Sequence, residues 1–314
     1  MNPAESRAVI DAPDVVVVGS ASRDIAPEDP RGWRLGGGVS YGGLALARLG
    51  MRTGMLVGVD ASGADAVELT DARSAGAEVA VAQLESSPVF ENREQPDGRI
   101  QVCLEPGLPV SREALPTAWR GARHWLLAPV AGELAEAWAQ VPPRDAVVAL
   151  GWQGLLRSMS AGSIVRRKAP QPSALLRRAS IVGLSLQDLE PDTRLEDLGA
   201  FLGPDVVVLA TDAERGGWWL RFVDGRLEER RHYPAISAHA VVDPTGAGDV
   251  FLAGYLAARA GHLLAGSGRA GTHLRLAAAA ASLTIEGRGM AGVPWLSAVA
   301  ERLASSLDGP APAG

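Results

Sequence analysis

One lysine, one cysteine and no closely spaced pair of histidines set limits on what this chain of 314 residues can do. A P-loop and a protein kinase each need a lysine in a defined motif, and Lys168 lies in neither setting. The single thiol, Cys103, excludes an internal disulfide and suits a reducing compartment. Scattered histidines offer no zinc site. If the chain handles phosphate, we therefore expect arginines and backbone amides to bind it.

Long apolar runs are also absent, because charged residues or glycine interrupt each candidate before it reaches membrane-spanning length. The N-terminal residues lack the charged start and apolar run of a secretory signal, so we expect no leader and a cytoplasmic location. A net charge of −6 and a pI near 5.5 argue against nucleic acid or a membrane surface as partner. The 47% of hydrophobic residues can bury a sizeable core.

What the chain does contain is a succession of short β-branched runs that alternate with helical stretches. We predict buried strands at 14–19, 55–59, 124–130, 145–150, 180–184 and 205–210. We predict helices at 44–49, 64–75, 132–140, 274–285 and 293–307. This alternation favours one parallel sheet with helices on both faces.

The stretch 241–251, Val-Val-Asp-Pro-Thr-Gly-Ala-Gly-Asp-Val-Phe, concentrates the chemistry. The two valines end a predicted strand, and a glycine-rich turn then opens a helix. A helix start leaves backbone N–H groups unpaired at the positive end of the dipole, which makes an anion site. Asp249 lies beside that site, where a carboxylate could take a proton from a hydroxyl. The plainer interpretation is a helix start capped by Thr245.

This stretch resembles the C-terminal signature of the PfkB (ribokinase-like) carbohydrate kinases, D-T-x-G-A-G-D-x-F, with Pro244 where threonine is usual. The resemblance implies that Asp249 is the catalytic base. It also implies that the backbone amides of Gly246, Ala247 and Gly248 form an anion hole for the moving phosphoryl group.

The same resemblance assigns the donor side of the site. It places Asp243 and Thr245 at the nucleotide, and it allows a monovalent cation such as K⁺ beside Asp243. The stretch from Thr211 to Gly216 resembles the T-x-G-x-x-G motif near the nucleotide phosphates, with Ala213 at the middle glycine. These likenesses imply that Thr211 and Gly216 contact the donor.

A second, distant match lies in the N-terminal half, where Gly36 to Gly43 resembles G-G-x-x-x-N-x-A. It implies that Gly37 and Gly38 approach the acceptor closely. Tyr41 stands where asparagine is usual, and its ring suits stacking or a less polar acceptor. Asp24 follows the first strand and by itself resembles an ordinary turn residue. The family resemblance makes it a ligand for sugar hydroxyls.

Residues 86–104 predict a hairpin that turns at 96–98. It fits the β-lid that this family lays over the sugar, paired with strands near 21–36. A lid excludes water during phosphoryl transfer. Phe90, Asn92, Arg99 and Gln101 are the candidates to face the substrate, and each could equally be an ordinary hairpin residue. Lids in this family often pair across a dimer, so the resemblance allows a homodimer here, but the sequence does not determine the oligomeric state.

Two shorter likenesses complete the assignment. Gln153-Gly-x-x-Arg157 resembles a segment of a PfkB branch that includes inositol-kinase-like members. Ser185 to Asp188 resembles a shortened N-x-x-E motif, which implies that Asp188 helps to position Mg²⁺ through water.

Together these likenesses predict one domain over residues 1–314: a three-layer α/β sandwich of ribokinase type, with a mostly parallel central sheet and a small β-lid from segments near 21–36 and 86–104. The implied activity is ATP- and Mg²⁺-dependent transfer of the γ-phosphoryl group to a hydroxyl of a small polyol, a sugar or cyclitol. One alternative is a nucleoside kinase of the same fold, which the ring of Tyr41 favours. Another is a catalytically weak ligand-binding or regulatory homologue, which the altered motif positions favour.

Overall fold

The fold is organised around one nine-stranded sheet, seen in a computed structural model that describes residues 12–95, 98–261 and 270–306. Its strands, in spatial order, are β16 (Arg226–Tyr233), β15 (Gly217–Val223), β14 (Asp205–Thr211), β13 (Ile181–Ser185), β9 (Val147–Gly151), β8 (His124–Leu127), β1 (Val15–Ser20), β4 (Thr53–Val59) and β5 (Glu78–Gln83). The seven strands from β14 to β5 pair in parallel, and β15 and β16 add an antiparallel edge.

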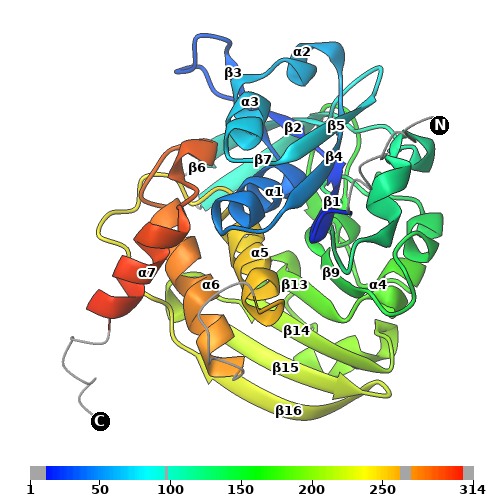
Figure 1. Ribbon diagram of the computed structural model, residues 1–314, viewed down its shortest axis with the longest axis vertical. Coiled ribbons are helices and arrows are strands. Elements are labelled where there is room, and N and C mark those ends of the chain that lie inside the picture. Colours follow the sequence, from blue (N-terminus) through cyan, green and yellow to red (C-terminus); the bar gives the residue numbers. More distant parts are fainter. Residues whose placement is uncertain (1–11, 96–97, 262–269, 307–314) are drawn as a thin grey trace, which may run out of the picture.

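Both faces of this sheet are buried, which explains the continuous β-branched runs. Along β1, Val15 and Val17 belong to one apolar core, and Val16 and Val18 belong to the core on the opposite face. Successive strand side chains point to opposite faces, so only an all-apolar strand satisfies both cores. Figure 1 shows α5, α6 and α7 grouped on one side of the strands, away from α4.

Seven α-helices cover the sheet within the described residues. They are α1 (Gly38–Arg48), α2 (Ala61–Ala64), α3 (Val67–Ser74), α4 (Ala174–Arg178), α5 (Ala247–Arg259), α6 (Ala270–Thr284) and α7 (Leu296–Ser305). None of these helices combines the length and the apolar character needed to cross a membrane. The three-layer α/β architecture predicted from the sequence is therefore observed.

A second, five-stranded sheet rises from the end of β1. It is ordered β11 (Ser163–Ile164), β7 (Gly98–Glu105), β6 (Val89–Gln95), β2 (Ser22–Ile25) and β3 (Trp33–Gly36). The two segments assigned to a lid thus lie in one sheet, where Arg23 and Asp24 of β2 pair with Val89 and Phe90 of β6. Its action as a lid, and pairing of two lids in a dimer, stay predictions.

Two predicted elements are absent or reduced in the structure, and a third prediction falls partly outside the described residues. Residues 241 and 242 form no strand: Val241 is 70% exposed and Val242 48%, because the chain crosses the surface there instead of entering the sheet. Within 132–140 only a short 3₁₀ helix, Glu136–Gln140, is formed. Residues 96 and 97 of the predicted hairpin turn lie outside the described residues.

The order of the strands places the site. From β1 the chain moves outward through β4 and β5, then returns to β8 on the other side of β1 and proceeds to β9, β13 and β14. In open α/β sheets ligands bind beyond the carboxyl ends of the strands where this reversal occurs. Segments that follow β1, β8, β9, β13 and β14 therefore surround one site.

Candidate active site

The start of α5 forms one wall of the site and presents unpaired amides. Gly246 is the N-cap residue in a left-handed conformation, with φ of 79°. The Ala247 N–H donates to the Pro244 carbonyl at 3.3 Å, whereas the Gly248 and Asp249 N–H groups have no acceptor among the described residues. A Cβ on Gly248 would have no neighbour within 4 Å, so space lies open in front of this residue. The arrangement can receive an anion at the helix N-terminus.

Asp249 lies in the first turn of α5 against the start of α1. A Cβ on Gly38 would lie 2.8 Å from Oδ1 of Asp249, so glycine is needed for the two helix starts to approach. Burial raises the pKa of Asp249 to about 6 and is the largest influence on it. The positive charge of Arg157 opposes that rise, and the negative charges of Asp188 and Asp24 add to it. A carboxylate with a raised pKa is a stronger base.

Asp24 lies on β2, across the glycine run from Asp249. Its carboxylate rests over Gly36, where a Cβ would collide with Oδ2, and Oδ1 accepts a hydrogen bond from Ser22 Oγ at 2.9 Å. Gly37 has φ of 87°, and a Cβ there would lie 2.7 Å from the Ser20 carbonyl. The turn between β3 and α1 therefore requires glycine. It brings the two carboxylates that the sequence assigned to acceptor and base to the same place.

Tyr41 does not present its ring to an open acceptor site. Its side chain is 2% exposed, and a Cβ on Gly246 would collide with the ring. The tyrosine therefore packs beneath the turn that precedes α5, where burial raises the pKa of its hydroxyl. The ring thus supports the amide turn from below, and its contact with an acceptor stays a prediction.

The second sheet contributes less to the site than predicted. Phe90 is 1% exposed and packs with Cys103 and Val130, so it belongs to the core beneath the sheet and does not face an open site. Gln101 does reach inward: its Nε2 donates to Asn92 Oδ1 at 3.2 Å, and its Oε1 accepts from Arg157 Nη1 at 3.0 Å. Arg99 lies on β7, with its side chain outside the described part of the structure.

Arg157 was not assigned from the sequence and lies at the centre of the site. It follows β9, and its Nη2 donates to Asp188 Oδ1 at 3.2 Å. Gln153 donates to the same oxygen at 3.4 Å, and the Ser185 N–H donates to Oδ2 at 3.2 Å. The resemblance of Gln153-Gly-x-x-Arg157 to a kinase segment already pointed to this arginine. Only the fold shows that Arg157 connects Gln101 of the second sheet with Asp188.

These bonds bear on metal binding. Asp188 is buried and directs both oxygens at protein donors, which favours the positioning of Arg157 over the binding of a metal-bound water. Among the residues with described positions, no group of three or more histidine, cysteine or acidic side chains could enclose a metal ion. Mg²⁺ bound to phosphates needs only one or two protein carboxylates. A magnesium role for Asp188 stays a prediction.

Glu133 is a second residue that the sequence did not reveal. Its carboxylate is buried and accepts hydrogen bonds from the N–H groups of Ser20, Val130 and Ala131, at 2.8 to 3.2 Å. Burial raises the pKa of Glu133, although these N–H groups oppose the rise. The residue fastens the carboxyl end of β1 to the loop after β8, on which one side of the site depends.

On the donor side of the site, both carboxylate oxygens of Asp243 accept hydrogen bonds from backbone N–H groups. Its Oδ1 accepts from the Thr245 N–H and its Oδ2 from the Gly289 N–H, both at 3.0 Å. Burial works to raise the pKa of Asp243, but these bonds and the charge of Arg34 outweigh it and lower the pKa. Arg34 Nη1 lies 4.0 Å from Oδ2. A donor contact by Asp243 or Thr245, and the monovalent cation, stay predictions.

The loop after β14 holds the remaining donor residues. Thr211 Oγ1 donates to the Leu184 carbonyl at 3.3 Å, which joins the ends of β13 and β14. Gly216 is buried with φ of 86°, and a Cβ there would collide with the Tyr233 carbonyl. Ala213, at the position where the likeness has glycine, adopts φ of 46°. Glycine is thus needed at 216 for packing, and alanine is strained at 213.

This strain gives a stability prediction. We expect Ala213→Gly to raise the free energy of unfolding by about 0.5–1 kcal/mol, because the left-handed conformation costs an alanine more than glycine loses in backbone entropy. Chemical denaturation measures the change. Gly216→Ala is the matched opposite, since its Cβ would meet backbone, and it should destabilise the protein. An Ala213→Gly variant no more stable than the parent would contradict the assigned conformation.

Comparison with protein families matches residues 188–296 to the pfkB family carbohydrate kinase. The matched region includes the turn before α5 and Asp249. No curated protein matches the chain.

Solved structures match over nearly the whole chain. A pyrophosphate-dependent myo-inositol-1 kinase is 17% identical, with a TM-score of 0.69 over 91% of this chain and 98% of its own. An Arabidopsis thaliana ribokinase, solved with ribose and ATP, is 21% identical, with a TM-score of 0.65 over 93% and 99%. A Methanocaldococcus jannaschii nucleoside kinase is 16% identical, with a TM-score of 0.65 over 94% and 99%. At sequence identities of 16 to 21%, this structural similarity shows the fold alone, which is the ribokinase-type fold predicted from the sequence.

Proposed function

The chain has the ribokinase fold and carries a PfkB-family carbohydrate kinase region, and from this premise we propose that it transfers a phosphoryl group to a hydroxyl of a sugar or cyclitol. The observation that carries the proposal is the position of Asp249. This carboxylate shares a helix start with two unpaired amides and lies beside Gly38, while the Asp24 carboxylate lies beside Gly36 and its charge acts on Asp249. The neighbours include a sugar kinase and a cyclitol kinase.

The proposed mechanism uses three groups of this chain. Asp24 holds the acceptor by accepting hydrogen bonds from its hydroxyls. Asp249 takes the proton of the reacting hydroxyl as the hydroxyl oxygen attacks phosphorus, while the bridging P–O bond of the donor breaks and ADP leaves, or phosphate when pyrophosphate is the donor. The Gly248 and Asp249 N–H groups stabilise negative charge on the phosphoryl oxygens during the transfer. Magnesium, arriving with the donor phosphates, supplies further neutralisation of that charge.

Arg157 has two proposed effects on the base. Its charge limits the rise in the pKa of Asp249, so that the base is ionised at neutral pH. Its guanidinium is fixed by Asp188 and Gln101, and a fixed cation beside the site can orient a hydroxylated acceptor without a change in conformation.

The raised pKa of Asp249 predicts the pH profile. A base works only when deprotonated, so kcat should rise tenfold per pH unit below about 6 and level off above it. Initial rates from pH 4.5 to 8.5 measure the profile. The Arg157→Gln variant removes the charge that opposes the shift, and its midpoint should move to higher pH. A midpoint near 4, or no movement in the variant, would exclude this assignment.

ATP is the proposed phosphoryl donor, with pyrophosphate as the alternative, because three of the similar structures are of pyrophosphate-dependent kinases. Purified protein is assayed with each donor and a panel of sugars, cyclitols and nucleosides, and phosphorylated product is quantified by mass spectrometry. Product that depends on an acceptor and on Asp249 supports the kinase proposal. Donor hydrolysis alone, equal in wild type and Asp249→Asn, would refute it.

The two alternatives from the sequence are weakened by specific contacts. A nucleoside acceptor was favoured by the ring of Tyr41, and that ring is packed beneath Gly246. A homologue without catalytic activity has no need for a carboxylate of raised pKa beside two unpaired amides. The nucleosides in the acceptor panel and the Asp249→Asn comparison test both alternatives directly.

A further inference from the structure

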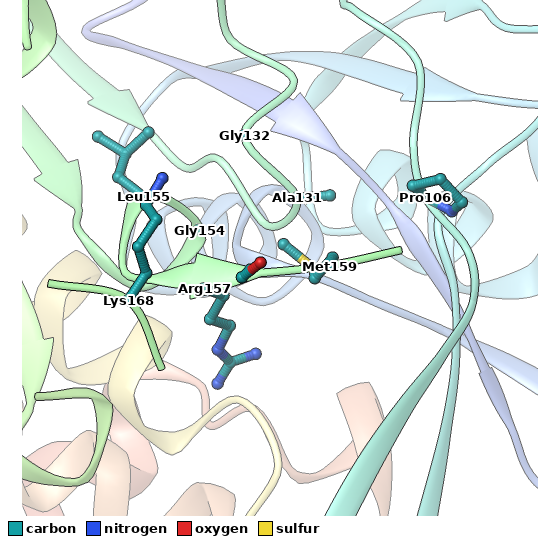
Figure 2. A pocket seen from close by; sticks show the side chains of 9 residues that line it. Pro106, Ala131, Gly132, Gly154, Leu155, Arg157, Met159 and Lys168 are labelled. Atoms are coloured by element: carbon teal, nitrogen blue, oxygen red, sulfur yellow. The ribbon is translucent and has the colours of Figure 1, made fainter. Parts of the chain in front are cut away.

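A cavity of about 360 Å³ opens beside the proposed active site. Figure 2 shows it between the loops after β8 and β9, and its lining includes Gly132, Gly154, Arg157, Ser158, Met159 and Lys168. This volume suits a small molecule or one part of it. No residue assigned from the sequence to acceptor, donor or metal contributes to the lining.

The cavity and the proposed base share one residue. Arg157 lines the cavity, while its guanidinium donates to Gln101 and Asp188 and its charge acts on Asp249. Figure 2 shows Arg157 and Lys168 extending in opposite directions, with Lys168 beside Leu155. A ligand in the cavity therefore lies next to the reacting end of the site, on the far side of Arg157.

The charge of the lining has one sign. Its ionisable residues, Arg157 and Lys168, are both cationic, although the whole chain carries −6. The Lys168 N–H donates to the Leu156 carbonyl at 2.8 Å, which fixes its backbone beside the cavity. Within the described part of the chain its ammonium group takes part in no hydrogen bond or ion pair.

Neighbouring charges reinforce the cationic character. β10 (Arg157–Ser158) and β12 (Arg166–Arg167) form a two-stranded ribbon in which Arg157 pairs with Arg167 and Ser158 with Arg166. Two acids near the lining are occupied: Glu133 accepts three backbone N–H groups, and Asp188 is paired with Arg157. Glu105, which precedes Pro106 of the lining, is a third acid there. Of the two cations in the lining, Lys168 is the one without an ion pair in the described part of the chain, so its ammonium group is available to an anion.

We propose that this cavity binds the anionic group, a phosphate or carboxylate, of an acceptor whose hydroxyl end reaches Asp249. The inference rests on the proposed function and narrows its substrate class from neutral polyols to hydroxylated anions such as sugar phosphates or sugar acids. Lys168 is the residue that determines this specificity, because a charged hydrogen bond to it is gained only by the anionic acceptor. Arg157 lies between the two ends of the ligand.

The test compares acceptors in neutral and anionic pairs: ribose with ribose 5-phosphate, glucose with glucose 6-phosphate, and glucose with gluconate. Wild-type kcat/KM should favour the anionic member of at least one pair by roughly 10- to 100-fold. The two glucose pairs distinguish phosphate from carboxylate. Lys168→Met should remove the preference by raising KM for the anion, with KM for the donor unchanged, and Lys168→Arg should restore most of it.

Arg226→Met removes an exposed positive charge at the far edge of the sheet and is the matched control. Isothermal calorimetry of the same anions with wild type and Lys168→Met tests the cavity without turnover. If the anions bind in a way that depends on Lys168 but no acceptor is turned over, the cavity proposal is supported and the kinase proposal is rejected. Turnover of neutral and anionic acceptors alike, or a preference that survives in Lys168→Met, would reject the cavity proposal and leave the kinase standing.

Discussion

Asp249→Asn should lower kcat by about 10²–10⁴-fold while the protein remains folded and still binds the phosphoryl donor. The asparagine occupies the same space beside Gly38 but cannot accept the proton of the attacking hydroxyl. Steady-state rates with the acceptor identified by the panel give kcat, and calorimetry gives donor affinity. A variant with wild-type turnover would end the assignment of Asp249 as base.

The same substitution should raise stability at neutral pH. Folding raises the pKa of Asp249 to about 6 from an ordinary value of 3.8, so the folded state binds more protons than the unfolded state between these values. Stability is consequently lost as pH rises through that window, and the ionised carboxylate destabilises the fold above it. Asparagine carries no such charge. A lower activity with a higher melting temperature at pH 7.5 separates a catalytic role from a structural one.

Gly248→Ala should leave the fold intact and lower kcat/KM for the donor by about 10²-fold or more. Beyond its chain neighbours and the backbone of its own helix, no protein atom lies within 4 Å of a Cβ at this position, so the methyl group displaces no other residue. It projects into the space in front of the two unpaired amides, where the phosphoryl group is proposed to lie. Donor kinetics and thermal unfolding measured on the same preparation show whether activity and stability separate.

Gly271→Ala in α6 is the matched control. Gly271 also lies in the first turn of a helix, and a Cβ there has no neighbour within 4 Å. Both alanines should be neutral or mildly stabilising because alanine favours helix over glycine. Only Gly248→Ala should lose activity. Equal donor kinetics in the two variants would show that nothing binds in front of Gly248.

The backbone of the site was largely predictable because its signals are local. The continuous valines of 15–18 predict a strand buried on both faces, and the glycine-rich turn before Asp249 predicts the helix start at Gly246. The helix predicted at 44–49 begins six residues earlier, at Gly38, because the glycines expected to form a loop belong to its first two turns. Each of these signals acts over a few residues. Nine strands then assemble into a sheet whose order reverses at β1. This topology brings Asp24 and Asp249 to the same glycine run.

Side-chain roles were less predictable where packing decides them. Tyr41 and Phe90 were expected at the acceptor and are buried, since a large apolar surface gains more from a core than from an open site. The sequence does not identify Arg157 as a site residue, because its hydrogen-bond partners Gln101 and Asp188 are 56 and 31 residues away in the chain. No local pattern contains such a pairing.

The sequence by itself determined the alternation of strands and helices, the glycine-rich turn that opens α5, and the carboxylate placed beside unpaired amides, because these depend on periodicity and on backbone conformation. Only the tertiary structure decided that Arg157 stands between Asp249 and a cationic cavity, and that Glu133 ties β1 to β8. Charges act through space at distances of a few ångströms, and the distance between two residues is a property of the folded chain.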